Sequence, residues 1–166
     1  MSKTVKRHFL REKDTEDILQ ELSHKLNVDA EQLLGSEPRM ELAETQSSKI
    51  LIVNGTPILA RLNNVLSPTL FFKEILSFLP KIIVDMGTIP HICNGADLMA
   101  PGIVQIHGNF NENDILLIVD ERHKKPLAIG IALFDAQHTR KQKRGKVVKN
   151  IHYVGDKLWN SLKKML

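Results

Sequence analysis

The chain has 166 residues, of which 42% are apolar and 25% are charged, and its formal net charge is +4. This length suits one ordinary domain or two small ones, and the apolar content excludes a disordered chain. The apolar runs are too short to cross a bilayer, the N-terminus shows no apolar signal segment, and the single cysteine, Cys93, excludes an internal disulfide. We therefore expect a cytoplasmic protein that does not associate with membranes.

Residues 1–78 are predicted to form a small α+β domain. Asp14 and Asp29 are typical N-caps, and the apolar spacing after them predicts helices over 14–26 and 30–34, the second ended by Gly35. Alternating apolar residues predict strands near 40–42, 50–53 and 58–62, with a hairpin turn at Asn54-Gly55. Ser67-Pro68 is typical of a helix start, so a third helix is expected to run to Leu79.

Residues 79–166 shift toward β structure. Short strands are predicted at 82–84, 103–106, 115–119, 127–134, 147–148 and 151–153. Thr88 is expected to cap a short helix over 89–94, and Asp156 to cap a last helix. Gly130 inside a strand predicts a bulge or a close backbone approach. Several short strands with two short helices indicate a small closed or half-closed barrel.

The excess positive charge lies in this second half. Residues 1–78 contain 10 basic and 11 acidic residues, whereas residues 79–166 contain 13 basic and 8 acidic ones. A run of basic residues attracts polyanions such as nucleic acids, although a solvated basic loop has the same composition. Six basic residues fall in ten positions without an acidic one: Arg140, Lys141, Lys143, Arg144, Lys146 and Lys149.

Known catalytic signatures are missing from the sequence. We find no phosphate-binding loop, dinucleotide fingerprint, nucleophile elbow or zinc-protease motif. His91 and Cys93 stand two residues apart on a predicted helix, so they point in different directions and do not suit a shared site. Asp85 and Asp97 stand beside glycine-rich turns, which their side chains can stabilise by hydrogen bonds. We therefore expect no catalytic residues, no metal and no cofactor.

The segment 84–102 is rich in glycine and small residues. Glycines at 87, 95 and 102 allow positive φ and the close approach of another backbone. A short helix between two such turns would present backbone amides and small side chains along one rim, against which a sugar-phosphate strand can lie. Tight turns that serve only the fold have the same pattern.

Four segments in this half, in this order, resemble the PUA domain, which is named for pseudouridine synthases and archaeosine transglycosylases. They are V-D-M-G-T, N-G-A-D-L-M-A-P-G, K-P-L-A-I-G-I-A and N-I-H-Y-V-G-D-K-L-W, and the resemblance covers residues 79–155. Upstream, S-P-T-L and F-L-P-K-I-I-V-D resemble the pre-PUA domain of the translation-associated family that includes the malignant T-cell-amplified protein and ligatin. The resemblance implies an α+β pre-PUA domain over 1–78. A mostly-β PUA pseudo-barrel with short helices and the C-terminal helix would follow over 79–166.

The resemblance also implies RNA binding by the glycine-rich helix and the strand that follows it. Tyr153, Leu158 and Trp159 are expected to be mainly structural, closing the barrel and docking the last helix. The segment 140–149 is more basic than we expect of the family. The residues expected to contact RNA or to shape the contact are Gly95, Ala96, Asp97, Leu98, Met99, Pro101 and Gly102, with phosphate contacts from Lys81, Arg140, Lys141, Lys143, Arg144 and Lys146.

The partner implied is tRNA or small-subunit ribosomal RNA, in translation initiation or recycling. Two alternatives remain open at this stage. The chain could be a detached subunit that presents RNA to a tRNA- or rRNA-modifying enzyme. It could also be a protein-interaction module whose first half binds the ribosome or a translation factor.

Overall fold

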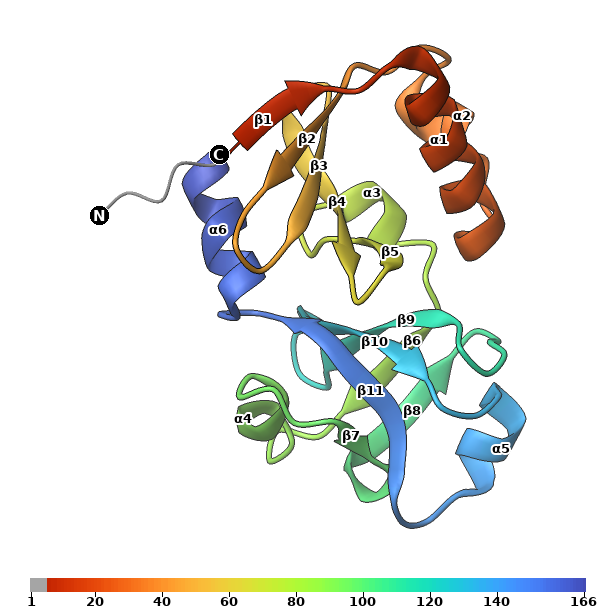
Figure 1. The fold of residues 1–166 in the computed structure, drawn as a ribbon. Coiled ribbons are helices and arrows are strands. Elements are labelled where there is room, and N and C mark those ends of the chain that lie inside the picture. The colour runs from red at the N-terminus through yellow and green to blue at the C-terminus, as the bar shows by residue number, and fades with distance from the viewer. Residues whose placement is uncertain (1–5) are drawn as a thin grey trace.

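A computed structural model describes residues 6–166 as two units, each built on one β-sheet (Figure 1). The N-terminal sheet has five strands in chain order, each antiparallel to its neighbours. This confirms the predicted α+β fold of the first half. Its elements are β1 (Lys6–Phe9), α1 (Glu12–Leu26), α2 (Ala30–Leu34), β2 (Met40–Glu44), β3 (Lys49–Val53), β4 (Thr56–Leu62), β5 (Val65–Pro68) and α3 (Lys73–Leu76).

The second unit is a six-stranded sheet of order β7-β11-β10-β9-β6-β8, in which only the β6–β9 pair is parallel. The two edge strands, β7 and β8, are consecutive in the chain, so the sheet curls around its own apolar cluster into a half-barrel. This confirms the predicted mostly-β pseudo-barrel with short helices. Its elements are β6 (Lys81–Val84), α4 (Ile89–Ile92), β7 (Leu98–Met99), η1 (Ala100–Gly102), β8 (Ile103–His107), β9 (Ile115–Asp120), β10 (Pro126–Ala132), α5 (Ala136–Lys141), β11 (Lys146–Tyr153) and α6 (Lys157–Met165).

Most of the local predictions are confirmed. Asn54 and Gly55 have φ values of 50° and 88°, as a tight hairpin turn between β3 and β4 requires. The Asp29 and Asp156 carboxylates accept the capping bonds of α2 and α6 from Gln32 N–H and Trp159 N–H. The register of β10 against β11 shifts at Gly130, which is the predicted bulge.

Three local predictions were wrong, and one helix was missed. The Thr88 side chain makes no capping bond to α4 and instead donates to the Asp85 carboxylate. Helix α1 begins after Arg11, and Asp14 lies in its first turn, 3.0 Å from the Arg11 guanidinium. Ser67-Pro68 ends strand β5, because the edge of the sheet tolerates a proline that has no N–H to donate, and α3 is only four residues long. Helix α5 was missed inside the basic run, although Asp135 caps it by accepting from His138 N–H.

The N-terminal sheet is covered on both faces (Figure 1). Leu51 and Val53 of β3 join the cluster that contains residues of α1 and α2, whereas Ile50 and Ile52 pack with Leu158 and Leu162 of α6. Alternation along a strand sends successive side chains to opposite faces, which explains this division. The chain thus leaves the first unit, builds the second, and returns to cover the first.

Two residues expected to close the barrel therefore lie on the other unit. Leu158 belongs to the α6 cluster, and the Trp159 ring stacks at a tilt on Phe71, with 6.1 Å between centroids. Tyr153 does pack against the barrel cluster. The division of the chain at residues 78 and 79 stays a prediction.

One apolar cluster is continuous across the junction of the two units. It joins Leu76 and Leu79 at the end of the first to Leu117 and Val119, on the face of the second sheet that is turned toward the first unit. Polar contact reinforces it, because the buried His152 accepts a hydrogen bond from Leu70 N–H at 3.3 Å. Among residues 6–166, no helix is long and apolar enough to cross a membrane.

Candidate functional site

Residues 95–102, here called the rim, connect α4 to β8 at the open edge of the half-barrel. Gly95, Ala96 and Pro101 are exposed, and Met99 is 45% exposed, which is unusual for a large apolar side chain. Leu98 is buried and anchors the segment in the barrel cluster. The rim therefore offers backbone, small side chains and one thioether to solvent.

Asp85 and Thr88 fix the inner side of the rim. The Asp85 carboxylate accepts from Thr88 N–H at 2.8 Å and from the Thr88 hydroxyl at 2.7 Å, and Asp85 N–H donates to Gly102 O at 3.1 Å. A Cβ on Gly102 would lie 2.5 Å from the Thr88 hydroxyl oxygen, so this glycine permits the close approach. The turn-stabilising role predicted for Asp85 is confirmed.

Asn150 ties the other side of the rim to β11. Its Nδ2 donates to Ile92 O at 3.0 Å and to Ala96 O at 3.1 Å, while its backbone N–H donates to the Asp97 carboxylate at 2.9 Å. Its Oδ1 is buried and has no hydrogen-bond partner among the described residues. The sequence analysis missed Asn150, although it opens the N-I-H-Y segment.

The Asp97 carboxylate has two partners within the protein. Besides Asn150 N–H, its carboxylate faces Lys146 Nζ at 3.4 Å. A carboxylate at an RNA contact would repel phosphates, and these two partners draw its charge toward β11. We infer that Asp97 positions the rim and does not itself face a phosphate.

The structure brings part of the basic run to the rim. Met99 pairs with Lys146 in the β7–β11 ladder, and Ala100 N–H donates to Gly145 O at 2.9 Å. Lys141, Lys143, Arg144 and Lys149 are exposed along α5, the connection and β11. Arg140 instead donates to Gly108 O at 3.0 Å.

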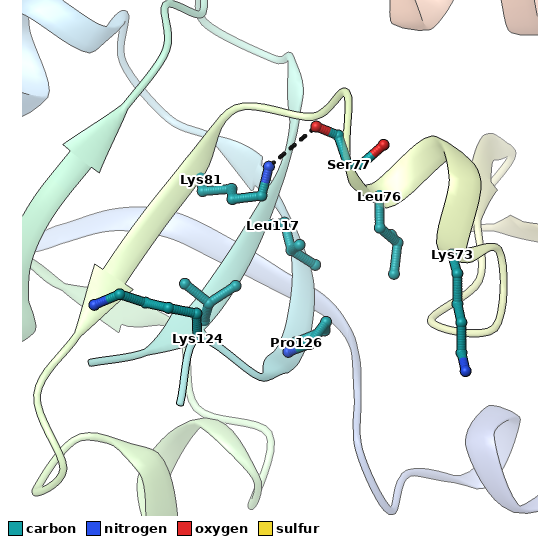
Figure 2. Close-up of a pocket in the computed structure, with 8 residues that line it drawn as sticks. Lys73, Leu76, Ser77, Lys81, Leu117, Lys124 and Pro126 are labelled. Carbon is teal, nitrogen blue, oxygen red and sulfur yellow. Dashed lines mark hydrogen bonds between the residues drawn. The ribbon is translucent and has the colours of Figure 1, made fainter. Parts of the chain in front are cut away.

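Lys81 is not brought to the rim. It begins β6 opposite His107 of β8 and Leu117 of β9, whereas Asp85, just past the other end of that strand, touches Gly102. Its Nζ donates to Ser77 O and to Leu79 O, both at 3.2 Å. It lines a pocket at the junction of the two units (Figure 2).

His91 and Cys93 form no reactive pair. His91 is exposed, whereas Cys93 packs against the barrel cluster, and burial raises the pKa of its thiol. A raised pKa lowers the thiolate fraction that a nucleophile needs. Within residues 6–166, no three His, Cys, Asp or Glu side chains gather in a way that could hold a metal ion.

Two family models match this chain. The PUA domain matches residues 80–154, and a domain of unknown function, DUF1947, matches residues 6–73. The chain is 42% identical over 159 residues to an uncharacterized protein of Methanocaldococcus jannaschii, covering 93% of this chain and 96% of that one.

Eukaryotic relatives match over a smaller share of their length. Translation machinery-associated protein 20 of Schizosaccharomyces pombe is 30% identical over 86 residues, covering 49% of this chain and 48% of that protein. Malignant T-cell-amplified sequence 1 of Rattus norvegicus is 31% identical over 117 residues, covering 68% and 64%. The chain thus matches about half to two thirds of the length of these two proteins.

Solved structures share the whole fold. A hypothetical protein of Pyrococcus horikoshii superimposes with a TM-score of 0.81 at 33% identity, covering 95% of this chain and 99% of that one. A PUA-domain structure from Aeropyrum pernix superimposes with a TM-score of 0.85 at 24% identity, covering 98% and 93%.

Proposed function

The chain belongs to the family of PUA-domain proteins with an N-terminal DUF1947 domain, and from this premise we propose that it binds RNA at the rim. In this proposal the RNA backbone lies along residues 95–102, and the lysines of β11 and the preceding connection neutralise its phosphates. The protein would act by binding alone, without catalysis.

The observation that supports this most is the pairing of β7 with β11. It sets Lys146 beside the exposed Met99, so one surface combines an apolar contact with positive charge. Small residues on either side do not hold a strand of RNA away. Three further exposed cations, Lys141, Lys143 and Arg144, extend the charge from this surface toward α5.

We further propose that the RNA is tRNA or small-subunit ribosomal RNA, in translation initiation or recycling. The support is the name of the Schizosaccharomyces pombe relative, translation machinery-associated protein 20. The rim suits recognition of RNA by shape and backbone, and its Met99 side chain suits packing against an unpaired base.

A salt titration of binding to unfractionated tRNA tests the proposal. Each neutralised phosphate contributes about 0.7 to 0.9 to the slope of log K against log salt. We expect Lys143→Gln/Lys146→Gln to bind more weakly than wild type and to lose about 1.4 to 1.8 of that slope. The control, Lys13→Gln/Lys164→Gln, removes two exposed lysines of α1 and α6 and should leave the slope unchanged. A wild-type protein that does not bind tRNA, or binds with no salt dependence, contradicts the proposal.

Co-purification separates translation from the RNA-modification alternative. Association of the full chain with ribosomal subunits in cell extract supports the proposal. Association with a pseudouridine synthase or a transglycosylase, and not with ribosomes, would assign it to RNA targeting. The full chain is needed, since α6 covers the N-terminal sheet: deletion of the second unit exposes that face of the sheet, and deletion of the first exposes the apolar side of α6.

A further inference from the structure

A pocket of about 190 Å³ opens where α3 of the first unit meets β6 and β9 of the second (Figure 2). Its floor is apolar and includes Leu76, Leu117 and Val119. Its eight lining residues include three lysines and no acidic residue. Lys73 comes from the N-terminal unit, whereas Lys81 and Lys124 come from the C-terminal one.

The lysines stand at the border of the pocket. In Figure 2 the Lys73 and Lys124 side chains lie on opposite sides of it, and Lys81 lies above them, next to Ser77. Lys81 Nζ donates two hydrogen bonds, to the carbonyl oxygens of Ser77 and Leu79, which leaves one ammonium N–H for a ligand. The site thus combines an apolar floor with a cationic border.

A buried carboxylate builds the turn that carries Lys124. Asp120 is 4% exposed and accepts from His123 N–H at 2.6 Å and from Lys125 N–H at 3.0 Å. These bonds, with that of Lys124 N–H to Asp120 O, hold Lys124 at a φ of 54°, which is uncommon for lysine. The turn therefore presents Arg122, His123, Lys124 and Lys125 to solvent in succession.

This basic turn connects the pocket to the support of the rim. The Glu121 carboxylate accepts from Met86 N–H at 3.2 Å, and so its charge is directed toward the 85–88 turn. Asp85, in that turn, holds Gly102 of the rim. The basic turn is thus linked through the 85–88 turn to the residue that ends the rim.

We propose that the junction pocket is a second RNA contact, which receives one unpaired nucleotide of an RNA strand that also lies on the rim. The base would pack on the apolar floor, and the adjoining phosphates would lie against Lys73 and Lys124. A nucleotide fits because it joins a flat, largely apolar group to an anion. This inference rests on the proposed RNA binding and extends it, since Lys73 gives the N-terminal unit a share in the affinity.

An acidic peptide shares the anionic character of RNA. The link of the basic turn to the 85–88 turn favours RNA, because a strand bound at the pocket and at the rim would pass the exposed Arg122 and Lys125. The two ligands also differ in what they bring to the floor, where only RNA supplies an unpaired base beside each negative charge.

The test compares Lys73→Gln/Lys124→Gln with the control Lys13→Gln/Lys164→Gln, using a fluorescent single-stranded oligouridine of twelve nucleotides. Glutamine keeps most of the lysine stem and removes its charge, and Lys81 is left intact because it holds α3. Two lost phosphate contacts reduce the salt slope by about 1.4 for a single strand. The ratio of the wild-type association constant to that of the pocket variant should therefore fall about sevenfold between 50 mM and 200 mM salt. Thermal unfolding of each variant checks that the fold is retained.

The outcomes separate the two proposals. If wild type binds and the Lys143→Gln/Lys146→Gln rim variant weakens binding, but the pocket variant keeps the slope of the control, the pocket inference is overturned and RNA binding stands. If wild type binds neither tRNA nor oligouridine, both fail. A pocket variant that loses affinity for a polyglutamate peptide, and not for oligouridine, assigns the pocket to an acidic protein and also overturns the inference.

Discussion

Replacing Asn150 tests whether this side chain holds the rim in place. Asn150→Ala removes the two bonds from Nδ2 to Ile92 O and Ala96 O, and it keeps the backbone bond to Asp97. Each lost hydrogen bond costs about 0.5 to 1.5 kcal/mol. The substitution also removes the buried Oδ1 that lacks a partner, which returns about 1 kcal/mol. We therefore expect a net loss of up to about 2 kcal/mol.

This loss can be read by thermal and guanidinium unfolding. For a chain of this size a loss of about 2 kcal/mol lowers Tm by roughly 4 to 8 °C, which is the upper limit expected. RNA affinity should fall as well, because the rim is no longer fixed to β11 and must be ordered when RNA binds.

Asn150→Asp is the decisive companion variant. It keeps the shape of the side chain, but places a carboxylate against two carbonyl oxygens and near Asp97. The introduced carboxyl should have a raised pKa in the folded state, so its neutral form is favoured and stability is lost as pH rises. Asn150→Asp should thus be less stable than Asn150→Ala at pH 8 and recover part of the difference at pH 5. Equal stability of the two variants at pH 8 would refute the two hydrogen bonds from Asn150 Nδ2 to Ile92 O and Ala96 O.

Three further predictions concern packing and acid stability. Gly130→Ala should cost about 1 to 3 kcal/mol, because its Cβ would overlap Val148 Cγ1, and an unchanged Tm would contradict this. Leu162→Ala should cost about 2 to 5 kcal/mol and should speed proteolysis of the chain, since it loosens α6 from the N-terminal sheet; unchanged proteolysis would count against that packing. Burial raises the pKa of Asp156, but the hydrogen bond and charge of His152, with two backbone N–H groups, outweigh this, so the pKa is lowered overall. The stability it contributes is present above its unfolded pKa and is lost as pH falls through its folded pKa, so Asp156→Asn should flatten the acid limb of a stability–pH profile.

Local chemistry was sufficient to predict much of the fold. The hairpin at Asn54-Gly55 and the caps at Asp29 and Asp156 depend on residues a few positions apart, and all three were confirmed. Ser67-Pro68 misled because the same dipeptide also suits the end of an edge strand. Pairing with β4 decides whether this dipeptide starts a helix or ends a strand, and the local sequence does not encode that pairing.

The site was predicted less completely than the fold. Residues 95–102 were identified from glycine spacing and family resemblance, and they do form one segment. Asn150 was missed, and Lys81 was expected to contact the same RNA but lies away from the rim. Asn150 of β11 bonds to the backbone of residues more than fifty positions earlier in the chain. The Lys81 side chain bonds to Ser77, directly after α3 of the first unit. The first of these contacts joins distant parts of the chain.

The return of α6 to the N-terminal sheet has a consequence for synthesis on the ribosome. The strands of residues 40–68 are translated early, but the cover of their outer face, with Ile50 and Ile52, includes Leu158, Leu162 and Met165 of α6. During elongation that face stays open to water and to other nascent chains, and the first unit cannot reach its final packing before the last helix emerges. A chaperone that shields this face during translation would therefore have a defined period of action, which ends when α6 docks.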